Sequence, residues 1–289
     1  MRAADKTPQV RHGETGNWIG SFLGHKGAVW SAKIDASQTL CVTGSGDFTA
    51  KLWCATSGKE LHEFKHKHVV RTVDFSQDSR RIISGCQNGQ IRTYDTCHPA
   101  NDPQILNESS LSRGELEGGA PTKVLWSTRD NDVAFVGTRG GWIQKWDTRT
   151  SSGPVASVLL STEGGAIADI ELSLNMDKIT VACENKVTFL NLSHIHYMLK
   201  SHVMPESLNF KEEGGVSLRA DGTVFFAGGS DLWVREFDAE TGEVLRVMKG
   251  HHGPVRCVRY HPSGEISNMV ASGSEDGTIR LWDLKNNTE

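Results

Sequence analysis

The two ends of this chain carry nearly the same spaced phrase. It consists of a Gly-His pair, a later aspartate in a turn, and a tryptophan six residues after that aspartate. Its two copies are Gly24-His25, Asp47 and Trp53, and Gly250-His251, Asp276 and Trp282. A phrase that recurs in this way restricts the fold, because each copy must form the same supersecondary unit and neighbouring units must share one core.

The tryptophan position also recurs between the two copies. It is occupied by Tyr94, Trp146, Leu190 and Phe237. From Trp53 to Trp282, the successive residues at this position lie 41, 52, 44, 47 and 45 residues apart. A Gly-His, an aspartate and a tryptophan with a period of ~40–45 residues are typical of one blade of a WD40 β-propeller. Turn sequences such as Ala220-Asp221-Gly222 separate short apolar runs within the units. We therefore predict an all-β chain with four short antiparallel strands per blade and almost no helix.

The repeat spacing places the beginning of the chain inside a blade. Asp5 lies six residues before Arg11, and Arg11 lies 42 residues before Trp53. We predict a single WD40 β-propeller domain over residues 1–289, with a seven-bladed parent and with residues 1–12 as the remnant of an incomplete first blade. The alternative is a closed ring of six blades, in which residues 18–23 form the outer strand of the last blade. The two differ physically because an open ring leaves unpaired sheet edges.

The longest departure from the repeat period spans residues 96–119. This segment carries Pro99, Pro103 and Ser109-Ser110. We predict a loop insertion around one outer strand, which is either a partner site or a tolerated surface insertion.

The phrase residues predict a structural hydrogen-bond network in the two complete units. The carboxylate accepts from the imidazole, the second imidazole nitrogen meets a hydroxyl, and the hydroxyl accepts from the indole N–H. The two predicted tetrads are His25, Thr43, Asp47 and Trp53, and His251, Ser272, Asp276 and Trp282. The middle units are degenerate, with Asn88, Gly140 and Glu184 near the aspartate place. We expect those blades to open more easily.

The sequence predicts no catalytic residue, no metal site and no cofactor. A His-Asp-Ser set can form a hydrolase triad, but Ser272 is expected in mid-strand without a nucleophile elbow, and the same place holds Thr43. His62, His66 and His68 lie close together, yet no cysteine or carboxylate set completes a ligand shell. No glycine-rich phosphate loop precedes a helix.

One set of residues is predicted to contact partners. The fifth residue after each opening histidine is Trp30, Arg71 or Arg256. This place is the entry of a first strand, near the top rim of a propeller. Tryptophan and arginine are enriched at binding hot spots. The structural alternative for Trp30 is packing between blades.

Composition narrows the partners to other proteins. The net charge of −4 gives no strong basic field, so direct RNA binding is a weak alternative. No apolar run approaches the ~18 residues of a membrane span, and the first residues do not resemble a secretory signal. The six cysteines show no close pairing, which favours a reduced, cytoplasmic location, with a nuclear one as the second option. No small-molecule substrate is expected.

Several segments resemble the serine-threonine kinase receptor-associated protein family, also called unr-interacting proteins. They are residues 16–30, the run Asp47-Phe48-Thr49-Ala50-Lys51-Leu52-Trp53, and residues 67–75 and 249–258. The similarity is dense over residues 10–95 and 214–283 and thin over 96–213.

The resemblance implies a seven-bladed scaffold without catalytic activity. The family is similar in role to an adaptor of the survival-motor-neuron complex, which assembles spliceosomal ribonucleoprotein cores, and is linked to type I transforming-growth-factor-β receptor signalling and unr-dependent translation. Implied partners are Gemin-type and Sm-assembly proteins or proteins of the receptor kinase pathway. A sister family, the i subunit of eukaryotic translation initiation factor 3, looks similar over residues 24–30 and 251–254 and is the alternative.

Overall fold

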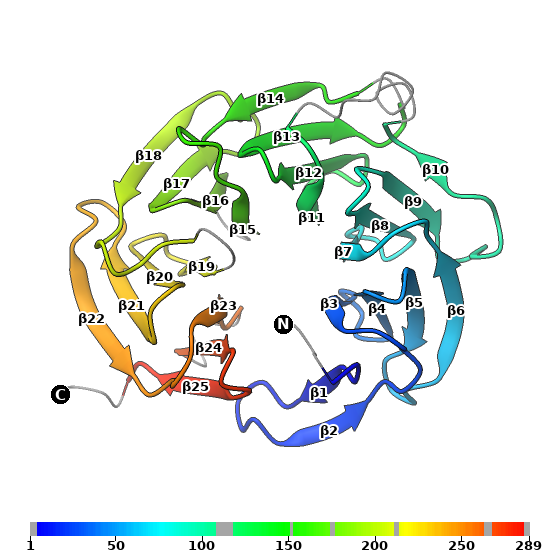
Figure 1. Ribbon diagram of the computed structural model, residues 1–289, viewed down its shortest axis with the longest axis horizontal. Coiled ribbons are helices and arrows are strands. Elements are labelled where there is room, and N and C mark those ends of the chain that lie inside the picture. The colour runs from blue at the N-terminus through cyan, green and yellow to red at the C-terminus, as the bar shows by residue number, and fades with distance from the viewer. Residues whose placement is uncertain are drawn as a thin grey trace. The chain divides into compact units, whose positions relative to one another are not determined.

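The computed structural model describes residues 5–107, 118–150, 153–173, 177–210, 214–262 and 268–285. Within these ranges every regular element is a β-strand, and the strands form seven antiparallel sheets (Figure 1). The chain divides into two compact units. The first contains the residues up to Arg11 and Asn17–Leu159, and the second contains His12–Gly16 and the residues from Leu160 onward.

The first unit contains one two-stranded sheet and three four-stranded sheets. The two-stranded sheet pairs β1 (Gln9–Arg11) with β2 (Trp18–Ser21). The second sheet consists of β3 (Val29–Ile34), β4 (Leu40–Ser45), β5 (Thr49–Cys54) and β6 (Glu60–Lys65). The third consists of β7 (Val70–Phe75), β8 (Arg81–Cys86), β9 (Ile91–Asp95) and β10 (Gln104–Ile105). The fourth consists of β11 (Pro121–Trp126), β12 (Val133–Thr138), β13 (Trp142–Asp147) and β14 (Ala156–Leu159).

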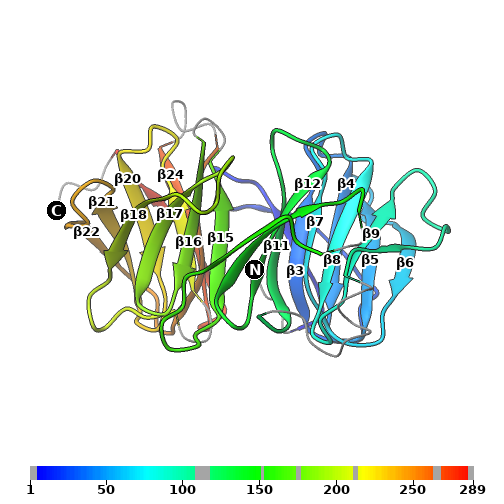
Figure 2. The same cartoon turned by 90° about the horizontal axis from the view of Figure 1, so that it is seen from above.

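The second unit contains three sheets, whose strands run side by side in chain order (Figure 2). The first consists of β15 (Ile167–Leu172), β16 (Lys178–Cys183), β17 (Lys186–Asn191) and β18 (Met198–Val203). The next consists of β19 (Gly215–Leu218), β20 (Val224–Gly228), β21 (Trp233–Asp238) and β22 (Val244–Lys249). The last has three strands, β23 (Val255–Tyr260), β24 (Met269–Ser274) and β25 (Ile279–Asp283).

The turn between the second and third strand of a sheet requires a left-handed residue. Gly277 follows Asp276 with a φ of 79°, and Gly89 follows Asn88 with a φ of 90°. Phe48 follows Asp47 at the same place with a φ of 69°, a conformation that costs a non-glycine residue ~1–2 kcal/mol. The hydrogen bonds of Asp47 to this turn, described below, offset that cost.

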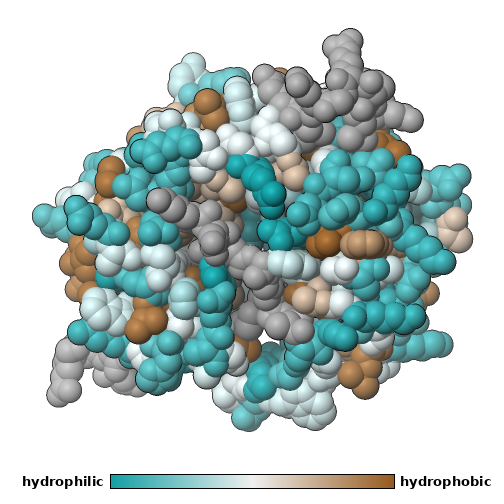
Figure 3. All heavy atoms as spheres, in the orientation of Figure 1, coloured by the Kyte–Doolittle hydropathy of each residue, from teal (hydrophilic) through white to brown (hydrophobic). Residues whose placement is uncertain are grey.

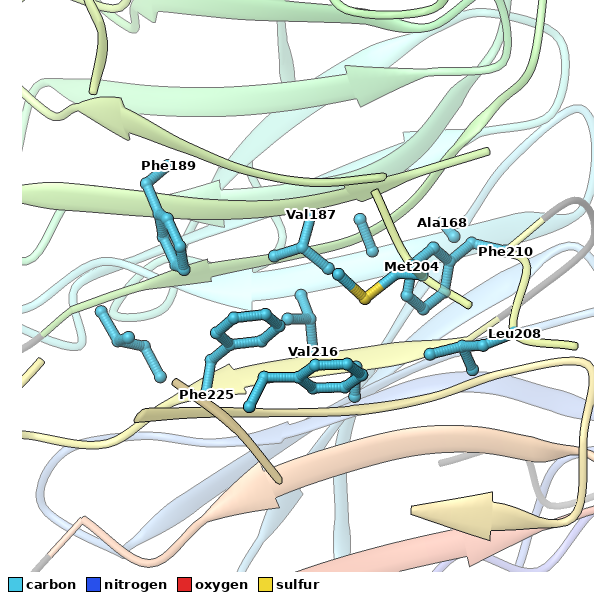
Figure 4. Close-up of a cluster of buried hydrophobic side chains, with 12 residues drawn as sticks. Ala168, Val187, Phe189, Met204, Leu208, Phe210, Val216 and Phe225 are labelled. Carbon is cyan, nitrogen blue, oxygen red and sulfur yellow. The ribbon is translucent and has the colours of Figure 1, made fainter. Parts of the chain in front are cut away.

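Apolar side chains fill the space between neighbouring sheets inside each unit. In the second unit, Val187 and Phe189 of β17 face Val216 and Phe225 of the next sheet, and Met204 and Phe210 close one end of the cluster (Figure 4). Phe225 and Phe237 stack with ring centroids 4.9 Å apart. In the first unit, Val42, Leu52 and Phe64 pack in the same way against Val73 and Ile82. Burial of these faces is the main stabilising term of the fold.

The first strands of neighbouring sheets are also joined by polar bonds. In the first unit, the Asp74 carboxylate accepts from the Trp126 backbone N–H at 2.8 Å. In the second unit, the Asp169 and Glu171 carboxylates accept from the backbone N–H groups of Val216 and Leu218 at 3.1 and 2.7 Å. These bonds satisfy backbone donors that a sheet leaves unpaired on its first strand, so they set the register between sheets.

The blade prediction is confirmed, and the six-bladed alternative is wrong. Residues 18–21 form β2, which pairs with β1 through Gln9↔Ser21 and Val10↔Gly20, whereas a six-bladed ring needs them beside β25. Phe22, just after β2, then packs against Trp53, with ring centroids 5.5 Å apart. This buried aromatic contact holds the hairpin on the first complete sheet.

Two expectations on domain boundaries fall partly outside the described ranges. Of the predicted insertion 96–119, residues 108–117 lie outside them, and the described part includes the short outer strand β10. Of the predicted remnant 1–12, residues 1–4 lie outside them. That residues 1–12 are the remnant of a larger blade stays a prediction.

Candidate functional site

The structure brings together the four side chains of the first predicted tetrad. His25 Nδ1 lies 2.8 Å from Asp47 Oδ2, and His25 Nε2 lies 2.6 Å from Thr43 Oγ1. The indole N–H of Trp53 donates to the same hydroxyl at 2.8 Å. The carboxylate fixes the proton of the imidazole on Nδ1, so Nε2 accepts from the hydroxyl.

The second predicted tetrad has the same arrangement in the last sheet. His251 Nδ1 lies 3.1 Å from Asp276 Oδ2, and His251 Nε2 lies 2.8 Å from Ser272 Oγ. Trp282 Nε1 donates to Ser272 Oγ at 2.8 Å. The two networks therefore differ only in the hydroxyl residue, threonine in one and serine in the other.

Each aspartate accepts more hydrogen bonds than the sequence indicated. Asp47 also accepts from the backbone N–H of Lys26 at 2.8 Å and from the hydroxyl of Thr49 at 2.7 Å. Burial opposes ionisation of Asp47, but the bonds from Thr49, Lys26 and His25 outweigh it and lower its pKa to about 2. The sequence could have indicated the threonine bond, because both aspartates are followed two residues later by a threonine, Thr49 after Asp47 and Thr278 after Asp276.

The sheet β7–β10 builds a related network with different partners. His66 Nδ1 donates to the carbonyl of Phe64 at 3.0 Å, which leaves Nε2 as the acceptor. Ser84 Oγ and Tyr94 Oη each lie 3.0 Å from that nitrogen. Burial lowers the pKa of His66 to about 4, because a proton on Nε2 would be desolvated.

Acidification is expected to destabilise the first unit through His66. The pKa of this group is about 4 when folded and near 6.5 when unfolded, so only the unfolded state takes up the proton as the pH falls between these values. Its stabilisation is therefore complete above pH 6.5 and declines below it, by about 2 kcal/mol between pH 7 and pH 5. Urea unfolding at the two pH values measures the loss. His66→Gln, which does not titrate, should lose correspondingly less, and equal losses in both proteins would contradict the assignment.

The sheet β15–β18 keeps a carboxylate at the turn between its second and third strands, although the residue is a glutamate and not an aspartate. Glu184 stands near the aspartate place, and its carboxylate accepts from Ser161 Oγ at 2.5 Å and from the Glu163 backbone N–H at 3.0 Å. Burial opposes ionisation, but these bonds lower the pKa of Glu184 to about 2. The longer glutamate side chain reaches a loop that holds Thr162-Glu163 at the place where the two complete units hold Gly-His. The degenerate sequence of this blade therefore does not mean an unsatisfied turn.

Two of the three predicted partner-contact residues lie against each other. The guanidinium carbon of Arg71, on β7, is 4.0 Å from the centroid of the Trp30 ring, on β3. Both side chains are half-buried. A second aromatic pair, Phe48 and His68, has ring centroids 5.5 Å apart, and Phe48 is 45% exposed. A Cβ at Gly46, two residues before Phe48, would lie 3.4 Å from Trp30 Nε1, so the turn that carries Phe48 begins beside the Trp30 indole.

We call these four residues, Trp30, Phe48, His68 and Arg71, the Trp30 surface. Sequence spacing missed Phe48 and His68, although an aromatic residue at a turn position that favours glycine is a usable signal. Arg256 belongs to the second unit, where its guanidinium pairs with Glu275.

The comparisons with known proteins agree with this arrangement. The WD domain, G-beta repeat family matches residues 16–54, 58–95 and 242–283. The serine-threonine kinase receptor-associated protein of Dictyostelium discoideum is 37% identical over 280 residues, covering 96% of this chain and 87% of that protein. The human protein of the same name is 36% identical over 278 residues, covering 96% of this chain and 73% of that protein.

The chain belongs to the serine-threonine kinase receptor-associated protein family. Its sister family is more distant: the eukaryotic translation initiation factor 3 subunit I of Caenorhabditis elegans is 27% identical over 297 residues, covering 98% of this chain and 88% of that protein. Among solved structures, the Myceliophteria thermophila Cps50 (Swd1) β-propeller domain matches with a TM-score of 0.79, over 97% of this chain and 91% of that one. At 16% identity, that similarity shows the β-propeller fold alone.

In this member of the receptor-associated family, the tetrads have the geometry of a structural device. Thr43 and Ser272 are both 0% exposed, so neither hydroxyl can reach a substrate. The described ranges contain no group of three or more His, Cys, Asp or Glu side chains placed to hold a metal ion. Nor do those ranges include a helix that could cross a lipid bilayer.

The surface of this family member is mostly polar on the face drawn in Figure 3. Hydrophobic residues appear there only as small separate groups among hydrophilic ones. Proteins that bind through such a surface rely on a few aromatic and arginine residues in a polar surround. The Trp30 surface has this composition.

Proposed function

We propose that this protein is a non-catalytic adaptor that binds other proteins in receptor serine/threonine kinase signalling and in the assembly of spliceosomal ribonucleoprotein cores. The observation that carries the proposal is the 36–37% identity, over 96% of the chain, to proteins named serine-threonine kinase receptor-associated protein. Proposed partners are receptor kinase pathway proteins and Gemin-type or Sm-assembly proteins. The proposed location is the cytoplasm, with the nucleus second.

The second candidate function is that of a translation initiation factor 3 subunit. It is favoured by the 26–27% identity to subunit I from two organisms over 96–98% of the chain. Affinity purification of the tagged protein from its source cells separates the candidates. Recovery of receptor kinase pathway or Sm-assembly proteins supports the adaptor proposal, and recovery of initiation-factor subunits without them refutes it.

The Trp30 surface is the proposed contact site for such partners. Trp30→Ala should weaken binding of a recovered partner by roughly tenfold or more, because a truncated hot-spot residue costs about 2 kcal/mol. It should lower folding stability by about 1–3 kcal/mol, because a half-buried indole loses its cation–π contact and part of its packing. Titration calorimetry and urea unfolding measure the two effects.

Arg71→Ala and Arg256→Ala test the other two predicted contact residues in the same assay. Arg80→Ala is the matched control, since Arg80 is an exposed arginine outside this surface. Unchanged binding of every purified partner by Trp30→Ala, Arg71→Ala and Arg256→Ala would refute the assignment of the surface.

A further inference from the structure

The turn between β4 and β5 holds an exposed aromatic ring in a backbone conformation that favours glycine. Phe48 has a φ of 69°, and the residue is 45% exposed. The same place in two other sheets holds Gly89 and Gly277, which adopt a positive φ at no steric cost. Phenylalanine here adds backbone strain and leaves apolar surface in water, and neither effect stabilises the turn. Strained residues of this kind are concentrated at binding sites.

Lysines flank this turn on both sides. On one side, the Asp47 carboxylate accepts from the backbone N–H of Lys26 at 2.8 Å. On the other side, the Phe48 carbonyl accepts from the backbone N–H of His66 at 2.9 Å, and Lys67 follows that histidine. Both Lys26 and Lys67 are exposed. The two loops next to the turn therefore each bring a solvent-exposed ammonium group to the neighbourhood of the Phe48 ring.

The charge of this turn differs from that of its counterpart in the second unit. There, Glu275 lies in the turn, and its carboxylate pairs with Arg256. In the first unit the place of Glu275 is taken by Gly46, which has no side chain. The carboxylate of Asp47 is engaged by donors of the turn and the tetrad. The flanking lysines therefore give this edge of the sheet a positive local field, although the whole chain has a net charge of −4.

We propose that the Trp30 surface, extended by Lys26 and Lys67, binds an acidic segment of a partner protein in which an aromatic residue lies between carboxylates. The aromatic side chain packs against Phe48 and His68, whose ring centroids are 5.5 Å apart. The carboxylates on either side of it pair with the two lysines. This inference rests on the proposed function, which assigns partner contacts to the Trp30 surface, and it adds the chemistry of the partner.

A nucleic acid is the other macromolecule that a basic, aromatic surface can bind, and the geometry favours it less. Bases stack on free faces of aromatic rings. One face of the Trp30 ring is covered by the Arg71 guanidinium, whose carbon is 4.0 Å from the ring centroid. The Phe48 ring lies against His68 at an interplanar angle of 32°. The surface therefore fits a segment that carries carboxylates better than a stack of bases.

A pair of matched peptides tests the proposal. The probe is the fluorescein-labelled peptide Gly-Glu-Glu-Phe-Glu-Glu-Gly, titrated with the full chain and followed by fluorescence anisotropy. We expect saturable binding that weakens as salt is added, because the lysines are exposed. The same peptide with glutamine in place of every glutamate should bind roughly tenfold more weakly or worse, because charge-assisted hydrogen bonds are lost. A labelled oligouridine should show no saturable binding.

Variants of the protein locate the site. Lys26→Gln combined with Lys67→Gln should weaken the acidic peptide roughly tenfold and leave binding of the glutamine peptide unchanged. Lys59→Gln is the control, since Lys59 is an exposed lysine beyond the other end of β5, and it should bind the acidic peptide normally. Phe48→Gly should weaken both peptides. Its urea unfolding midpoint should stay close to that of the unaltered protein, because glycine relieves the left-handed strain.

Failure of the acidic peptide to bind, equal binding of the two peptides, or full binding by the double lysine variant would overturn the proposal. Tighter binding of oligouridine than of the acidic peptide would assign the surface to a nucleic acid instead. These outcomes leave the proposed function standing, because the partners recovered by affinity purification test it. Recovery of initiation-factor subunits alone would refute the adaptor function while the peptide still bound, so the two failures are distinguishable.

Discussion

Replacing Asp47 with alanine is expected to lower the free energy of unfolding by ~2–4 kcal/mol, measured by urea denaturation. The carboxylate accepts from the imidazole of His25, the backbone N–H of Lys26 and both donors of Thr49. Alanine leaves the buried His25 imidazole and the half-buried Thr49 donors without their acceptor, and it removes the bond to the exposed Lys26 N–H. It also leaves Phe48 in a left-handed conformation without the bonds that hold the turn.

The lowered pKa of Asp47 gives a similar value for the contribution of its carboxylate to the free energy of unfolding. It is about 2 in the folded protein and near 3.8 when unfolded, so the stabilisation is present above about pH 4 and is lost as the pH falls through 2. A shift of this size corresponds to about 2 kcal/mol at neutral pH. The alanine variant should therefore lose part of the acid sensitivity of the unaltered protein.

Two further variants test the explanation for Asp47. Asp47→Asn keeps an acceptor for the turn and should lose roughly half as much stability. Asn88 between β8 and β9 shows that an asparagine can serve such a turn, since it accepts from the Gln90 backbone N–H. Asp276→Ala should repeat the alanine result in the second unit, since Asp276 accepts from His251, Thr278 and the His252 backbone N–H. An unchanged unfolding midpoint in both alanine variants would refute the structural role of the tetrads.

Replacing Arg259 with leucine is expected to destabilise the second unit by ~3 kcal/mol. The guanidinium makes a two-point contact with Asp169, with Nη1–Oδ2 at 2.6 Å and Nη2–Oδ1 at 2.9 Å. Asp169 is only 1% exposed. Burial already raises the pKa of its neighbour Glu171. The arginine side chain itself is 41% exposed, but without it the two buried carboxylates would share a site with no cation, and an uncompensated buried charge is costly.

A double variant separates the cost of the orphaned charge from loss of packing. Asp169→Leu combined with Arg259→Leu removes both charges, so the double variant should be more stable than Arg259→Leu alone. Arg259→Lys keeps the charge but contacts one oxygen at a time, and it should fall between the two. Equal stability of Arg259→Leu and the unaltered protein in urea denaturation would show that the pair contributes nothing. A double variant no more stable than the single one would show that the loss is one of packing.

The repeat phrase was sufficient to predict the fold because its parts act locally. A left-handed turn after Asp47 and Asp276, a hydroxyl on the second strand and an indole on the third together specify one hairpin, and each copy encodes them within about 30 residues. The period of the tryptophan place then predicts how many hairpins share a core. The same spacing placed Trp30 and Arg71 at equivalent positions, and they lie in contact because the first strands of neighbouring sheets are adjacent.

Three features depended on the tertiary structure. Glu184 accepts from a loop 19–23 residues earlier, about the separation of His25 and Asp47, but neither the glutamate nor its serine donor is the residue type that the repeat motif has at that place, so no signal in the sequence indicated the contact. Phe48 and His68 meet because two blades pack together. The pair of Arg259 and Asp169 joins residues 90 positions apart, and carboxylates on first strands look like ordinary polar strand residues in the sequence.

The amino-acid sequence by itself determined the blade, its hairpin turns and its polar tetrads, because those depend on side chains that meet within one repeat. Only the tertiary structure decided which sheet the hairpin of β1 and β2 packs against, which aromatic residues meet between sheets, and which carboxylates on first strands join neighbouring sheets. These depend on contacts between repeats, where burial and charge pairing act across separations that the repeat period does not record.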